Sequence, residues 1–164
     1  MNKKIPNMLS ILRIPLSLGM IFTRPFSTPF FLLYTLAGAT DALDGFLARK
    51  LNACTPFGAI IDSIADIVFF ATSLVKIIIA ITIPLWLWIC LAVIILIKFA
   101  NVLFGFITQK KLVLPHTIPN KISGFLIFLF PYALAFADVK YAAIPVCAVA
   151  IFAAVHESVI IVGN

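Results

Sequence analysis

The sequence contains little charge, and negative charge is especially scarce. Only 11% of its 164 residues are charged, and six acidic residues stand against twelve lysines and arginines. A soluble domain is usually about a quarter charged and about half apolar. Here 63% of the residues are hydrophobic. The composition therefore argues against a soluble domain and indicates an integral membrane protein.

Cysteine is also rare in this chain. The three cysteines, Cys54, Cys90 and Cys147, lie far apart, in or near apolar runs. An odd number of cysteines without metal-ligand spacing argues against both a disulfide framework and a zinc site. We expect all three to serve as packing residues.

The apolar runs lack the two-residue alternation of a membrane β-barrel, and no repeat or low-complexity linker separates them. Because every backbone polar group must be paired inside lipid, continuous apolar runs predict helices. Six segments approach the ~20 residues that a spanning helix needs. They cover about 8–23, 28–50, 56–82, 85–109, 118–136 and 141–162. We predict an all-α, six-transmembrane-helix bundle forming a single domain over 1–164.

The basic residues set the orientation of this bundle. One side would carry seven of them, Lys3, Lys4, Arg49, Lys50, Lys110, Lys111 and Lys121. The opposite side would carry only Arg24 and Lys140, with Lys76 near its edge. The positive-inside rule then places both termini in the cytoplasm, most simply at the cell (inner) membrane. The net charge of +6 suits anionic lipid headgroups, and no basic-aromatic pattern for nucleic acid is visible.

The N-terminal apolar run resembles a signal peptide, but it lacks one feature. No small-residue cleavage site follows it, and Arg13 interrupts it. We expect this segment to be retained as the first helix.

Four of the six acidic residues lie in one 26-residue stretch, DALDGFLARKLNACTPFGAIIDSIAD. Asp41 and Asp44 are three apart and Asp62 and Asp66 four apart, so each pair shares a helix face. A short connection between the two helices would let the pairs face each other across a polar cavity open to the cytoplasm. Four carboxylates at membrane depth require cations. Oxygen ligands suit Mg²⁺ or Mn²⁺, and four carboxylates suffice for two ions.

The neighbours of these aspartates suit a phosphate-bearing ligand. Gly45 and Gly58 would let a ligand approach the backbone, and Thr55 offers a hydroxyl. Arg49 can bind a phosphate through two parallel hydrogen bonds. Each has a plainer reading, since membrane glycines often serve helix packing and an Arg-Lys pair often anchors a helix end. Those readings do not explain why four aspartates occur together with these neighbours.

The same stretch resembles the CDP-alcohol phosphatidyltransferase family. The family pattern D-x2-D-G-x2-A-R-x8-G-x3-D-x3-D is matched with every gap correct. The matching residues are Asp41, Asp44, Gly45, Ala48, Arg49, Gly58, Asp62 and Asp66. An early P-N-x-L-S-x-x-R stretch also looks like the family, with Pro6, Asn7, Leu9, Ser10 and Arg13.

The resemblance implies a reaction and a role for each matched residue. CDP-diacylglycerol would give its phosphatidyl group to a small alcohol and release CMP. One metal ion would be held by Asp41, Asp44 and Asp62, and the second by Asp41, Asp62 and Asp66. Asp66 would also be the general base for the acceptor hydroxyl. The CDP-lipid would contact Gly45, Arg49, Thr55, Gly58, Asn7 and Ser10. A homodimer is expected.

The acceptor alcohol is not fixed by this resemblance. Family members that use glycerol 3-phosphate usually carry an arginine-bearing fourth helix and a G-K-x-K-T-like start of the fifth. Here those places read LIKFANVLFG and PNKISGFLIF. The candidate acceptor contacts are Lys98, Asn101, His116 and Lys121. These cations favour a phosphorylated acceptor such as glycerol 3-phosphate, with inositol, inositol phosphate or serine as alternatives.

Several polar residues in the apolar helices have other expected roles. Lys98 is expected to face the cavity or to pair with an aspartate. For His156 and Glu157 we expect hydrogen bonds between helices. A different class of function also remains open, a small cation transporter or channel whose intramembrane acids bind the transported ion. That class explains the aspartates but not Arg49, the glycines or the fixed spacing.

Overall fold

The computed structural model describes residues 5–51, 55–109 and 117–163. Within them the chain forms six α-helices and one short 3₁₀ turn, with no strand, which confirms the all-helical prediction. The elements are α1 (Ile5–Gly19), η1 (Met20–Phe22), α2 (Thr28–Lys50), α3 (Pro56–Ala80), α4 (Leu85–Gln109), α5 (Ile118–Leu134) and α6 (Val139–Gly163).

The helix boundaries agree with the sequence analysis to within a few residues. The bounds of α2 and α4 coincide with the predicted 28–50 and 85–109. The first helix differs most, because it begins at Ile5 and ends at Gly19, where the 3₁₀ turn takes over. Counting apolar residues alone misses its start, because Pro6 and Asn7 precede the continuous apolar run and are nevertheless helical.

Four of the helices are long and apolar enough to cross a membrane. They are Thr28–Leu47, Phe57–Ala80, Leu85–Phe104 and Val139–Ile161. Two further apolar helices are shorter, Pro6–Phe22 and Ile118–Leu134. These lengths and compositions indicate a membrane protein, and the count of six spans stays a prediction.

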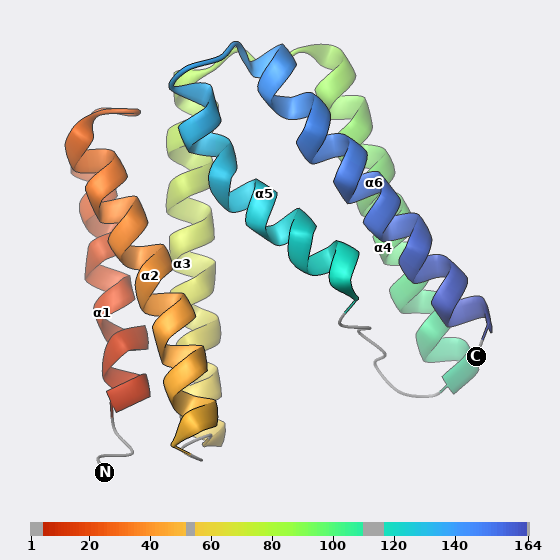
Figure 1. Ribbon diagram of the computed structural model, residues 1–164, viewed down its shortest axis with the longest axis horizontal. Helices are drawn as coiled ribbons and strands as arrows, with labels where there is room; N and C mark the ends of the chain where they lie inside the picture. The colour runs from red at the N-terminus through yellow and green to blue at the C-terminus, as the bar shows by residue number, and fades with distance from the viewer. Residues whose placement is uncertain (1–4, 52–54, 110–116, 164) are drawn as a thin grey trace. The chain divides into compact units, whose positions relative to one another are not determined.

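The first of two compact units comprises Met1–Ile81. In it α1 packs against both α2 and α3, and the three helices lie side by side (Figure 1). Aromatic rings join α2 to α3, since the Tyr34 ring lies 5.9 Å from Phe30 and 5.1 Å from Phe69 between centroids. This packing brings polar residues of three helices to one end of the unit.

The second unit comprises Thr82–Asn164, and α6 packs against both α4 and α5 in it. Small residues on α6 allow this close approach. Ala143 and Cys147 are buried against Leu87 of α4. Cys90 and Cys147 are free cysteines, as predicted, while Cys54 lies outside the described residues.

Candidate metal and phosphate site

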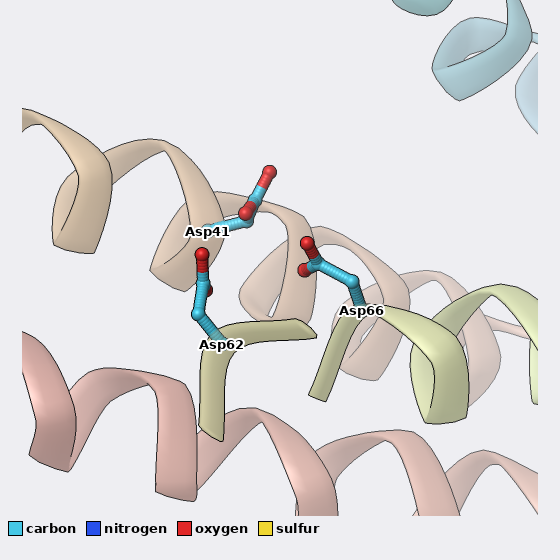
Figure 2. Close-up of side chains that lie close together, drawn as sticks. All are labelled: Asp41, Asp62 and Asp66. Atoms are coloured by element: carbon cyan, nitrogen blue, oxygen red, sulfur yellow. The ribbon is translucent and has the colours of Figure 1, made fainter. Parts of the chain in front are cut away.

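Three of the predicted aspartates converge in the first unit. Asp41 comes from α2, and Asp62 and Asp66 come from successive turns of α3 (Figure 2). Each offers one carboxylate oxygen, and these oxygens lie within 4.8 Å of one another. The side chains are 55%, 42% and 53% exposed, respectively. The three carboxylates, called the carboxylate triad below, are therefore close together and open to a ligand.

Asp44 is placed differently from the triad. Its side chain is buried, and its Oδ2 accepts a hydrogen bond of 2.9 Å from Ser10 Oγ of α1. Ser10 Oγ also lies 3.5 Å from Asp62 Oδ1. The structure thus brings three of the four predicted aspartates into one cluster and directs the fourth toward α1.

Arg13 of α1 links all four aspartates. Its side chain is fully buried. Nη1 lies 3.2 Å from Asp41 Oδ1 and 3.3 Å from Asp62 Oδ1, and it also pairs with Asp66 Oδ1. Nη2 pairs with Asp44 Oδ2. One guanidinium group therefore faces four carboxylates, which leaves the site with three negative charges in excess when every group is ionised.

Sequence reasoning assigned no site role to Arg13. In the sequence, Arg13 is notable only because it interrupts the first apolar run and because it belongs to the early family-like stretch. A charged residue in an apolar helix is nevertheless a signal for a functional partner, since an isolated charge at membrane depth is costly. Pairing this signal with the acidic stretch would have found the contact.

A cavity of about 160 Å³ adjoins these carboxylates. It is bounded by all three helices of the first unit. Its lining residues are Pro6, Ser10, Asp44, Gly45, Thr55, Gly58, Ala59 and Asp62. Four of the six residues predicted to contact the CDP-lipid, Ser10, Gly45, Thr55 and Gly58, are among them. The predicted ligand contacts and two of the aspartates therefore share one cavity wall.

The local structure at the start of α3 explains two of these residues. Thr55 is the N-cap of α3, and its Oγ1 accepts a 3.0 Å hydrogen bond from the backbone N–H of Gly58. A Cβ atom at Gly58 would lie 2.6 Å from Asn7 Oδ1 and 2.9 Å from Thr55 Oγ1. The space beside this glycine, expected to admit a ligand, is instead filled on this side by the Asn7 amide of α1.

Two predicted contacts cannot be placed. The Arg49 side chain and the whole of His116 lie outside the described residues. Their expected contacts with the CDP-lipid and the acceptor stay predictions.

The predicted acceptor contacts that are described all lie in the second unit. Lys98 Nζ of α4 lies 3.2 Å from Glu157 Oε2 of α6 and 3.3 Å from Asn120 Oδ1 of α5. Asn120 Nδ2 donates to the same Glu157 oxygen at 3.0 Å. Within the second unit the carboxylate that pairs with Lys98 thus belongs to Glu157 and not to an aspartate, while the alternative expectation that Lys98 faces the cavity stays a prediction. The expected helix-packing role of Glu157 is confirmed.

Asn101 and Lys121 differ in their surroundings. Asn101 is buried, donates to the carbonyl of Ala154 at 3.0 Å and accepts from Ser158 Oγ at 2.7 Å. Its side chain therefore joins α4 to α6, while Lys121 is exposed. The buried Nδ1 of His156 has no hydrogen-bond partner in the described part of the chain, and the expected hydrogen bond of this side chain stays a prediction.

The carboxylate triad fits a divalent cation by the chemistry of its donors. Carboxylate oxygens are the ligands that Mg²⁺ and Mn²⁺ prefer. In this structure a cationic nitrogen, Arg13 Nη1, already contacts all three carboxylates of the triad. The triad therefore surrounds a position suited to a cation. The single charge of Arg13 does not balance the negative charge of the carboxylates.

Comparison with known proteins gives partial matches to curated enzymes that carry one name, CDP-diacylglycerol–glycerol-3-phosphate 3-phosphatidyltransferase. The enzyme of Pseudomonas fluorescens is 40% identical over 77 residues, covering 43% of this chain and 39% of the relative. That of Wigglesworthia glossinidia brevipalpis is 40% identical over 84 residues, covering 48% and 46%. That of Escherichia coli strain K12 is 39% identical over 80 residues, covering 46% and 44%.

The chain thus spans less than half the length of these relatives in the matches. No solved structure matches it significantly. The family model for CDP-alcohol phosphatidyltransferases, in contrast, matches residues 3–157, which include the whole acidic stretch and the early P-N-x-L-S-x-x-R stretch. The chain therefore belongs to the CDP-alcohol phosphatidyltransferase family.

Proposed function

We propose that this protein transfers the phosphatidyl group of CDP-diacylglycerol to glycerol 3-phosphate and releases CMP. The observation that carries the reaction class is the convergence of Asp41, Asp62 and Asp66 within 4.8 Å, beside the cavity. The choice of acceptor rests on the printed names of the curated relatives. It agrees with the cationic residues that favour a phosphorylated acceptor.

The four aspartates would hold two Mg²⁺ or Mn²⁺ ions. Asp41, Asp44 and Asp62 would bind one ion, and the carboxylate triad would bind the other. When bound, the ions would supply positive charge against the phosphates and the departing CMP. The proximity of the triad oxygens supports the second ligand set. In the first set Asp44 would bind the ion through Oδ1, because its Oδ2 is held by Ser10 and Arg13.

Asp66 is the proposed general base. The acceptor oxygen would attack the phosphorus atom that carries the diacylglycerol, the bond from that phosphorus to the CMP oxygen would break, and the hydroxyl proton would pass to Asp66. A base must lie within hydrogen-bond reach of the proton that it accepts. Asp66 lies one helical turn from Asp62, which lines the cavity, and about half of its side chain is exposed.

The remaining predicted contacts are divided between the two substrates, the CDP-lipid and the acceptor. Asn7, Ser10, Gly45, Arg49, Thr55 and Gly58 would contact the CDP-lipid, and the Asn7 amide lies beside Gly58. Lys98, His116 and Lys121 would contact the acceptor, while the buried Asn101, whose amide bonds to Ala154 and Ser158, would hold α4 against α6. Lys98 is 44% exposed, so a phosphate could reach its ammonium group while Glu157 keeps it in position.

CMP release is the direct test of this function. The purified protein would receive radiolabelled CDP-diacylglycerol, Mg²⁺ or Mn²⁺, and glycerol 3-phosphate, inositol, inositol phosphate or serine in turn. We expect release with glycerol 3-phosphate that EDTA prevents. Asp62→Asn should abolish the release, whereas Asp138→Asn, which changes an exposed aspartate outside the site, should leave it unchanged. CMP release with only a different acceptor would replace glycerol 3-phosphate as the proposed acceptor. No CMP release with any acceptor would overturn the proposed activity.

The proposed setting is a homodimer with six spans, whose site faces the cytoplasm at the cell membrane. Cysteines placed at positions 50 and 110 should then react from the same side of the membrane. Labelling from opposite sides would refute the topology. A strictly monomeric mass in detergent would refute the dimer.

A further inference from the structure

Arg13 is the one buried cation beside the carboxylates of the described first unit, and its two terminal nitrogens have different surroundings. Nη2 pairs with the buried Asp44, which Ser10 also holds. Nη1 faces the partly exposed triad and contacts Asp41, Asp62 and Asp66 together. One end of the guanidinium is thus attached to a buried carboxylate. The other end lies where three ligand oxygens meet.

The third guanidinium nitrogen of Arg13, Nε, differs from the two terminal nitrogens. Arg13 Nε is buried and has no hydrogen-bond partner in the described residues. Leaving a buried donor unpaired is unfavourable, so the contacts of the two terminal nitrogens must outweigh it. The side chain is therefore held by its attraction to the carboxylates rather than by complete hydrogen bonding of the guanidinium. A stronger cation at the triad would remove part of that attraction.

We propose that Arg13 is a tethered substitute for a divalent cation. It neutralises the carboxylate triad when no metal is bound, and Nη1 must leave the triad when a metal ion enters. The inference rests on the proposed function in one respect, that the triad binds divalent cations. Arg13 is then a positioning residue. It preserves the geometry of the empty triad and, by competing for the same oxygens, lowers its affinity for metal.

The proposal predicts opposite effects on two measured quantities. Removing the guanidinium should destabilise the metal-free protein, because four carboxylates lose their partner. The same change should strengthen metal binding, because the competing charge is gone. A purely structural arginine would give only the first effect, and a damaged site would bind metal more weakly.

The experiment uses the full chain in detergent with Mn²⁺ alone as the probe. Free Mn²⁺ is measured by electron paramagnetic resonance to give the dissociation constant, and the thermal unfolding midpoint is measured in EDTA and in saturating Mn²⁺. The variants are Arg13→Gln, which removes the charge, and Arg13→Lys, which keeps the charge but loses the fork. Arg24→Gln, at an exposed arginine, is the matched control.

We expect Arg13→Gln to bind Mn²⁺ about tenfold more tightly or better, since competition between like charges weakens binding. The rise in midpoint on adding Mn²⁺ should increase from the control, through Arg13→Lys, to Arg13→Gln. Equal or weaker Mn²⁺ binding by Arg13→Gln would overturn the inference. If that variant does not fold, Arg13→Lys decides, because a Mn²⁺-induced rise no larger than the control's would overturn it as well.

Failure of the inference is separable from failure of the proposed function. Mn²⁺ binding by the unchanged protein, with no gain in the Arg13 variants, would leave the metal-dependent reaction standing and remove only the substitute role. No Mn²⁺ binding by the unchanged protein or by any variant would overturn both.

Discussion

The two units each place charged residues inside apolar helices, but they balance these charges differently. In the first unit one arginine faces four aspartates, and the three aspartates of the triad are about half exposed. In the second unit Lys98 meets a single carboxylate, Glu157, and Asn120 bonds to both. Excess charge that stays accessible requires a ligand, whereas a balanced pair can serve helix packing alone. The difference between the units therefore indicates which carboxylates are available to bind ions and which one is already occupied by a cationic partner.

The largest expected difference between the units is in turnover. Asp62→Asn removes a carboxylate assigned to both ions and should abolish measurable CMP release. Asp138→Asn, the matched change at an exposed aspartate of the second unit, should retain most of it because no ion or substrate depends on that carboxylate. CMP release from equal amounts of folded protein is the measurement. Near-normal turnover by Asp62→Asn in Mg²⁺ would show that the charge excess is not a metal site.

Asp66→Asn should lower the rate ~10²–10⁴-fold, the usual loss when a general base is removed. Binding of CDP-diacylglycerol should persist, because the cavity lining and the other three aspartates are unchanged. Thermal shift with CDP-diacylglycerol and CMP release on one preparation separate the two effects. Joint loss of binding and activity would make Asp66 a structural or metal residue only.

Substitutions of Lys98 and Glu157 in the second unit should have non-additive effects on the free energy of unfolding. Lys98→Met leaves the Glu157 carboxylate buried without its cation. We expect the free energy of unfolding to fall by ~1–3 kcal/mol. This is below the 3–5 kcal/mol typical of fully buried pairs, since the Lys98 side chain is 44% exposed. The double change Lys98→Met with Glu157→Met should recover most of the loss. A double variant as unstable as the sum of the singles would show that the two groups are independent.

A smaller effect on stability should come from the contact between Asn7 of α1 and Gly58 of α3. Gly58→Ala places a methyl group 2.6 Å from Asn7 Oδ1, and such overpacking destabilises by ~1–3 kcal/mol. Asn7→Ala should relieve the clash partly, because Thr55 Oγ1 lies 2.9 Å from the same position. Chemical unfolding of the two single variants and the double variant measures this. Full tolerance of the alanine would mean that the Asn7 and Thr55 side chains can turn away from the methyl group without loss of stability.

Much of the first unit was predictable from the sequence. The spacing of Asp62 and Asp66 fixes their common helix face, and the hairpin between α2 and α3 brings Asp41 toward them. The bounds of α2 also follow from the length of its apolar run, as do those of α4 in the second unit. In each case the deciding interaction is local, or it is imposed by a short connection.

The unpredicted contacts all join distant parts of the chain. Arg13 is 53 residues from Asp66, its partner on α3, and Lys98 is 59 residues from Glu157. Spacing within one helix carries no information about which face of another helix meets it. The choice between Asp and Glu as the partner of Lys98 therefore required the packing of α4 against α6.

The shortness of the first apolar helix has a consequence for the surrounding lipid. Pro6–Phe22 rises only ~26 Å at the α-helical 1.5 Å per residue, less than a hydrocarbon core of ~30 Å. On the six-span topology this mismatch would draw the two leaflets together beside the helix that carries Ser10 and Arg13. The bilayer would then be thinner than average near the carboxylates, and acyl-chain length would affect how readily a lipid headgroup reaches them.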